Sequence, residues 1–85
     1  MNDELLRRVV AVKARHEADL LKKANVVGVG VGFREKGGRP TDEVVLVVNV
    51  SRKQPASQLA PQDVIPPIIE GVPVDVRETG ELRAL

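Results

Sequence analysis

The stretch that decides the fold covers residues 26–33 and reads Val26-Val27-Gly28-Val29-Gly30-Val31-Gly32-Phe33. Successive side chains of a β-strand point to opposite faces, so this alternation predicts a strand with one aliphatic face and one glycine-lined face. Glycine in a strand costs backbone entropy and packs nothing, so we expect another group to approach the glycine face closely. The helix predicted from the same chain is the simplest candidate for that group.

That helix is predicted to precede the strand. Over residues 3–24, apolar side chains recur at spacings of three and four, while Asp3 and Glu4 suit the positive end of the helix dipole. Asn25 is a suitable residue to end the helix. His16 falls on or beside the apolar stripe. Because the chain holds no second histidine and no cysteine, we interpret His16 as a packed or half-exposed helix residue.

Two further strands are predicted downstream. Residues 43–50 are apolar on both faces, which is typical of a central strand covered on both sides. Residues 72–77 alternate, and Pro73 places that strand, or that position, at a sheet edge because proline cannot donate to a ladder. Residues 34–42 are interpreted as a hairpin loop, and residues 54–60 as one or two helical turns.

The resulting order, α-β-β-short α-β, predicts an α+β fold in which a long N-terminal helix packs on a small, mainly antiparallel sheet. The 85 residues suffice for one domain, 1–85, and not for two. We divide it into a helical part at 1–24, a sheet region at 25–77 and a tail at 78–85.

Composition argues against several classes of function. The 13 Lys+Arg nearly balance the 12 Asp+Glu, which speaks against nucleic-acid and membrane partners. Phe33 is the one aromatic residue, so bases have almost nothing on which to stack. The chain contains no apolar signal core and no run long enough to cross a bilayer, and we expect a cytoplasmic protein.

No chemistry-bearing pattern is found either. The glycines alternate within a strand, unlike the G-x-G-x-x-G of a nucleotide-binding turn, and the carboxylates are too scattered for a calcium loop. We therefore predict a protein that is not an enzyme, with no catalytic residue, cofactor or metal.

One helix covers only one face of a sheet, whereas two strands look apolar on both faces. An exposed apolar patch of several hundred Å² is rare on a monomer, so we expect self-association or a partner domain. The residues predicted to form the core or the interface are Val27, Val29, Val31, Phe33, Val45 and Val47. The leading hypothesis is a non-enzymatic interaction and assembly module that uses an apolar sheet face or an open strand edge.

Three segments carry a resemblance to a known family: NVVGVGVGF at 25–33, RKQP at 52–55 and IPPIIEGVPVDV at 65–76. Together they resemble the N-terminal accessory domain that precedes the protease domain in bacterial trypsin-like serine peptidases and in plant narrow-leaf type proteases. In those proteins the catalytic triad lies in the protease domain that follows, so no catalytic role is carried over to this chain. The resemblance implies a trypsin-like protease as a partner, for an excised domain or a free-standing relative.

Two other functions remain open at this stage. The chain could act as a propeptide-like folding aid or inhibitor, with Arg77 or Arg83 presented to the specificity pocket of a trypsin-like protease. It could also be a self-assembling filament or shell subunit, because valine-rich strands stack well and an unprotected edge can propagate.

Overall fold

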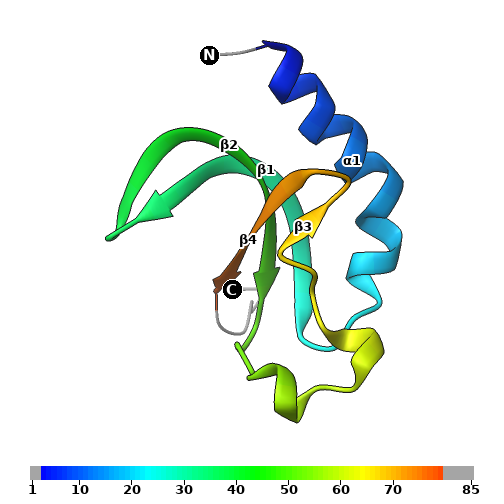
Figure 1. The fold of residues 1–85 in the computed structure, drawn as a ribbon. Coiled ribbons are helices and arrows are strands. Elements are labelled where there is room, and N and C mark those ends of the chain that lie inside the picture. Colours follow the sequence, from blue (N-terminus) through cyan, green and yellow to red (C-terminus); the bar gives the residue numbers. More distant parts are fainter. Residues whose placement is uncertain (1–2, 80–85) are drawn as a thin grey trace, which may run out of the picture.

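The computed structural model describes residues 3–79. Within this range the chain forms one long helix, four strands and two 3-10 turns (Figure 1). The elements are α1 (Asp3–Leu21), β1 (Val26–Lys36), β2 (Arg39–Val50), 3-10 turns at Ala56–Gln58 and Pro61–Asp63, β3 (Ile68–Ile69) and β4 (Val72–Glu78).

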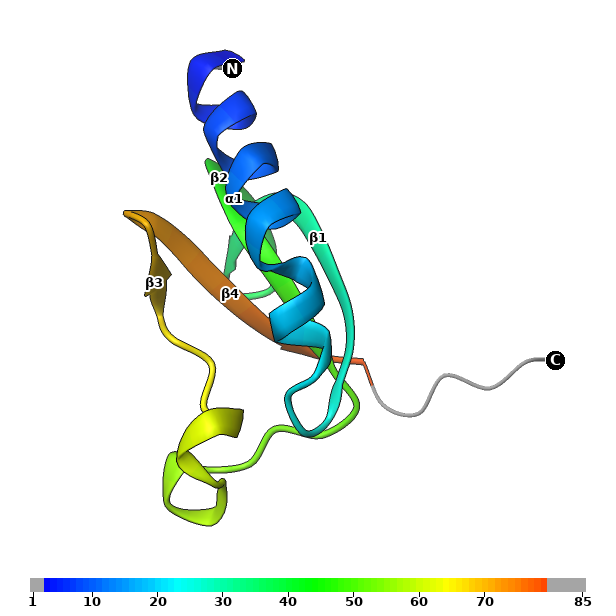
Figure 2. The ribbon, with the colours of Figure 1, turned by 90° about the vertical axis from the view of Figure 1, so that its right-hand side faces the viewer.

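The strands form a mixed sheet in the order β1-β2-β4-β3. β1 pairs with β2 and β3 with β4 in antiparallel fashion, whereas β2 and β4 run parallel. The helix α1 covers one face of this sheet and lies in front of the strands in Figure 2. The predicted α+β arrangement, with a long N-terminal helix on a small sheet, is confirmed.

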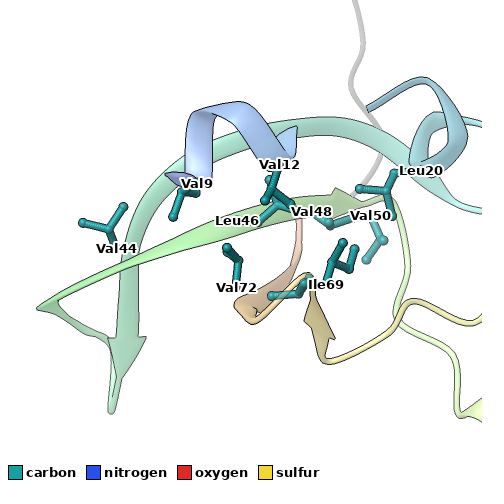
Figure 3. Close-up of a cluster of buried hydrophobic side chains, with 10 residues drawn as sticks. Val9, Val12, Leu20, Val44, Leu46, Val48, Val50, Ile69 and Val72 are labelled. Atoms are coloured by element: carbon teal, nitrogen blue, oxygen red, sulfur yellow. The ribbon is translucent and has the colours of Figure 1, made fainter. Parts of the chain in front are cut away.

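The core lies between α1 and the sheet, where β-branched side chains pack well on a pleated surface (Figure 3). Its buried members come from α1 and from every strand except β1: Val9, Val12, Leu20, Val44, Leu46, Val48, Val50, Ile69, Val72 and Val74. β2 is the central strand, and residues 44–48 are buried on both of its faces, as the doubly apolar pattern predicted.

The hairpin between β1 and β2 is longer than the sequence indicated. Both strands continue through the polar residues 34–36 and 39–42, and only Gly37 and Gly38 form the turn. Their φ angles of 59° and 78° lie in the left-handed region, which glycine adopts without steric cost. The loop prediction was wrong here because backbone pairing extends a hairpin beyond the last apolar residue. The helix ends at Leu21, and Asn25, with a φ of 68°, turns the chain into β1.

Residues 51–67 carry the chain from β2 across to β4. The helical turn predicted at 54–60 is the 3-10 turn Ala56–Gln58, and it follows Pro55. β4 lies inside the sheet between β2 and β3, so the edge assignment was wrong for the strand as a whole. Pro73 directly precedes Val74, the first residue of β4 that pairs with β2, so its missing N–H does not interrupt that ladder.

Candidate interaction surface

β1 forms one outer edge of the sheet. Its residues Gly28–Phe33 pair residue by residue with β2, and Val29 lies opposite Val48. No strand among residues 3–79 pairs with the other side of β1. In a strand, backbone N–H and C=O groups point alternately to either side, so this edge presents a row of unpaired donors and acceptors.

The side chains along residues 26–33 of β1 are apolar and partly exposed. Val29 and Val31 are half-buried against the core, whereas Val27 and Phe33 keep 39% and 38% of their surface in solvent. Beside Phe33 is a shallow cavity of about 130 Å³, lined by Leu6, Val31, Gly32, Phe33 and Val44. Four of the six residues predicted for the interface therefore lie together on the edge strand.

The flank of α1 beside this edge is also apolar. Leu6 reaches the cavity next to Phe33, which shows which side of the helix faces the β1 edge. At 3.6 residues per turn, Val10 and Leu21 lie roughly 40° and 60° around the helix axis from Leu6. Both are exposed. We call Leu6, Val10, Leu21, Val27 and Phe33 the edge surface.

The other face of the sheet is covered in a different way. Val45 and Val47 point away from α1, yet they expose only 0% and 5% of their surface. Both are core residues of the monomer, and the expectation of an uncovered second face is corrected at these positions. The glycine face of β1 lies on this side as well. A Cβ placed on Gly32 would lie 3.2 Å from Val47 and 3.8 Å from the Arg77 guanidinium. The groups nearest to the glycines are thus side chains of β2, Val47 at Gly32 and Asn49 at Gly28, with Arg77 of β4 also close to Gly32. The prediction that α1 approaches them was wrong.

Arg77 extends from β4 across β2 to β1. Its guanidinium forms ion pairs with Asp75 at 3.1 Å and with Glu35 at 3.2 Å, and it donates a hydrogen bond to the carbonyl oxygen of Phe33. A guanidinium in a fixed fork of donors suits such a bridge. In this arrangement Arg77 is engaged by its own chain rather than presented to a protease pocket. Arg83, the other predicted protease contact, lies outside the described residues.

A cluster of charged groups joins α1 to the turn between β3 and β4. Arg15 donates to both carboxylate oxygens of Glu70 at 2.8 and 3.0 Å, and His16 Nε2 lies 2.6 Å from the same carboxylate. Arg8 donates to the backbone carbonyl of Glu70 at 3.0 Å. Glu70 has a φ of 50° and Gly71 a φ of 78°, as expected of a two-residue hairpin turn. We call Arg8, Arg15, His16 and Glu70 the Glu70 cluster.

The sequence does not predict this cluster, because Glu70 is one of several carboxylates scattered along the chain. Its one sequence signal is the turn pair Glu70-Gly71, and nothing in the sequence connects that turn to residue 15. The hydrogen bonds from Arg15 and His16 lower the pKa of Glu70 to about 2, and the same contact raises the pKa of Arg15. Because every partner belongs to the chain itself, the arrangement holds the helix on the sheet and leaves His16 paired.

A larger groove of about 260 Å³ lies at the end of the sheet where β2 and β4 finish, walled by Asn25, Val50, Arg52, Gln54, Leu59, Asp63, Ile65 and Val76 among others. Polar groups in its wall form hydrogen bonds within the chain: Asn25 donates to Gln54 at 2.9 Å, and Asp63 accepts from the backbone N–H of Ala24 at 3.0 Å. In the described part of the chain, no three potential ligands gather to hold a metal ion.

No helix within residues 3–79 is long and apolar enough to cross a membrane. The chain matches no protein-family model and no curated protein. The resemblance to the accessory domain of trypsin-like peptidases therefore stays a prediction.

Proposed function

We propose that this chain is a non-enzymatic interaction module that associates through the edge surface. The observation that carries the proposal is the position of β1: a strand of eleven residues at the edge of the sheet, with Val27 and Phe33 exposed along it. Of the two surfaces considered from the sequence, the edge is favoured over the second sheet face, because Val45 and Val47 are already buried in the monomer.

The mechanism is strand addition. A strand laid beside β1 would satisfy its outward N–H and C=O groups, while apolar surface leaves water at about 25 cal/mol per Å². The short β3 at the opposite edge has only two residues. With a single long edge, the sheet favours an assembly that closes on pairing over a filament, which needs two edges of comparable length.

The occupant proposed first is a second copy of the chain. A segment of a trypsin-like protease domain is the other candidate, and the family resemblance supports it. Both would use the same edge. The propeptide-like role has less support, because Arg77 is bound to Asp75 and Glu35 within the sheet.

A measurement of mass in solution tests the proposal. At micromolar concentrations and above, light scattering should give a mass well over the 9.2 kDa of one chain. Val27→Lys should return the protein to the monomer mass, because a charge on an exposed edge position opposes strand addition. A wild-type protein that stays monomeric at all concentrations, and binds no dye specific for apolar surface, would contradict self-association.

The chain offers a matched control at its other edge. Ile68 on β3 is 61% exposed, so Ile68→Lys makes the same chemical change on a strand of only two residues. It should leave the mass of the assembly unchanged. If Ile68→Lys disrupts the assembly and Val27→Lys does not, the wrong edge has been chosen. If the wild type is monomeric and gains mass only with a trypsin-like protease, the partner is the protease.

A further inference from the structure

Residues 27–33 of β1 have a sequence that is symmetric about Gly30. Glycines stand at 28, 30 and 32, valines at 29 and 31, and the two exposed apolar residues Val27 and Phe33 stand three positions to either side. A strand with this pattern is complementary to a second copy of itself running in the opposite direction. We infer that two copies pair antiparallel through β1, on a two-fold axis at Gly30. This register rests on the proposed function and specifies its partner.

On the helix face, this register places Val29 beside the second copy's Val31. Phe33 would face Val27 of the second copy, at the β-bulge between Val26 and Gly28 that ends the regular part of the strand. The turn at residues 22–25 places the C-terminal end of α1, with Leu21, next to the start of β1, while Leu6 lies next to Phe33. The edge surface of one copy thus meets its own counterpart end to end, as an isologous contact requires.

On the other face the register avoids both steric and electrostatic conflict. Gly28 faces Gly32 of the second copy. The Arg77 guanidinium lies near Gly32, and neither of the two facing glycines has a side chain that would clash with it. The two Arg77 groups sit near the two Gly32 positions, which are four residues apart along the strand, about 13 Å. This separation exceeds the screening length of about 8 Å at physiological salt. The regular stretch 28–32 that the two copies pair contains no charged residue.

The register can be tested with single cysteines, because the chain contains none. In an antiparallel pair the Cα atoms of directly opposed residues lie about 4.5–5.5 Å apart, within the range that a disulfide spans. Gly30→Cys is well placed for this, since a Cβ there meets nothing within 4 Å. Mild oxidation should therefore convert the Gly30→Cys dimer into a covalent dimer on a non-reducing gel.

Gly28→Cys is the matched control. Its Cβ makes only ordinary contacts with Asn49, the nearest at 3.6 Å, and it lies on the same face. Across the proposed axis the two copies of residue 28 are about 13 Å apart, too far for a disulfide. Gly30→Cys should cross-link at least about tenfold faster than Gly28→Cys, because only its sulfurs are within reach.

The outcomes separate the register from the proposed function. Reduced variants that have the monomer mass, like a monomeric wild type, overturn both. Dimers in which residue 28 cross-links faster, or in which neither residue does, overturn the register and leave self-association standing. Hydrogen exchange of the wild type provides a readout without substitutions: amide protection over residues 28–32 should rise with protein concentration. Protection that does not change with concentration would overturn the register even if the cysteine variants fail to fold.

Discussion

The two faces of the sheet are buried by different means. On one face, α1 contributes Val9, Val12 and Leu20 to a close-packed aliphatic layer. On the other face, residues 3–79 form no second layer. The glycines of β1 leave room there for Val47 and for the long side chain of Arg77. The comparison teaches that two valines on the second face of a small sheet can be buried beside a bridging arginine, without another helix.

The sharpest test of this comparison uses two neighbouring valines of β2. Val48 faces α1 and Val47 faces away, and both are buried. Val48→Ala should lower the free energy of unfolding by about 2–3 kcal/mol, because the rigid neighbours of Val48 cannot fill the space that the lost methyl groups leave. Val47→Ala should cost about 1 kcal/mol, because the flexible Arg77 can settle into the space. Urea unfolding of both variants measures the difference. Equal losses would mean that the two faces are packed equally tightly.

Arg77 is the second point at which the comparison can fail. Arg77→Ala removes the bridge to Asp75 and Glu35 and uncovers Val47, and it should cost about 1–2 kcal/mol. It should also increase the fluorescence of a dye that binds apolar surface.

Arg77→Lys is the matched control for the loss of Arg77. Lysine keeps the charge and the aliphatic stem but loses the planar fork, so an intermediate stability is expected. If Arg77→Ala is as stable as the wild type and binds no more dye, the arginine does not cover that face.

The glycines sharpen the comparison further. Gly32→Ala places a Cβ 3.2 Å from Val47, whose β-branched side chain adjusts with difficulty, so a loss of about 1 kcal/mol is expected. Gly30→Ala meets nothing within 4 Å and should be neutral or stabilise by a few tenths of a kcal/mol. Thermal unfolding of both variants gives the measurement. A neutral Gly32→Ala would show that close approach is not the reason for glycine at this position.

The smallest effect is expected at the Glu70 cluster, which stabilises only the side of the sheet that α1 covers. The pKa of Glu70 is lowered in the folded protein, so its contribution is complete above its ordinary pKa and is lost as pH falls toward about 2. The wild-type Tm should therefore decline between about pH 5 and pH 2 by more than that of Glu70→Gln.

Arg15→Gln should remove much of the same acid-dependent component, because Arg15 is the main partner of Glu70. The double variant should add little to either single change. Parallel curves of Tm against pH for the wild type and Glu70→Gln would contradict this assignment.

Much of the fold could be predicted from local patterns. The continuous apolar run at 44–48 indicates a doubly covered strand, and the spacing of Val9, Val12 and Leu20 gives the buried stripe of α1. The parallel pairing of β2 with β4 could not be predicted, because the order of strands depends on contacts across the long connection 51–67. The same holds for the reach of Arg77 to Phe33 and of Arg15 to Glu70, which join residues 44 and 55 positions apart.

For the candidate site, the sequence predicts the strand but not its position in the sheet. Val29, Val31 and Phe33 were grouped correctly on the helix face, but a β-bulge between Val26 and Gly28 breaks the alternation, so that Val26 and not Val27 packs against the core. An alternating pattern also does not distinguish an edge strand from a strand with two neighbours. Val45 and Val47 looked equally available, because a pattern of apolar residues contains no information about which polar side chain will cross over them.

The parallel connection also bears on how the chain acquires its shape. Contacts between α1, β1 and β2 are close in sequence, whereas β4 must return over more than twenty residues to lie beside β2. Closing such a loop is entropically slow, so we expect β4 to dock last, after the N-terminal half has collapsed. During synthesis the nascent chain would present the valine-rich inner edge of β2 until residue 78 has left the ribosome. In that interval the polypeptide is most vulnerable to misassembly.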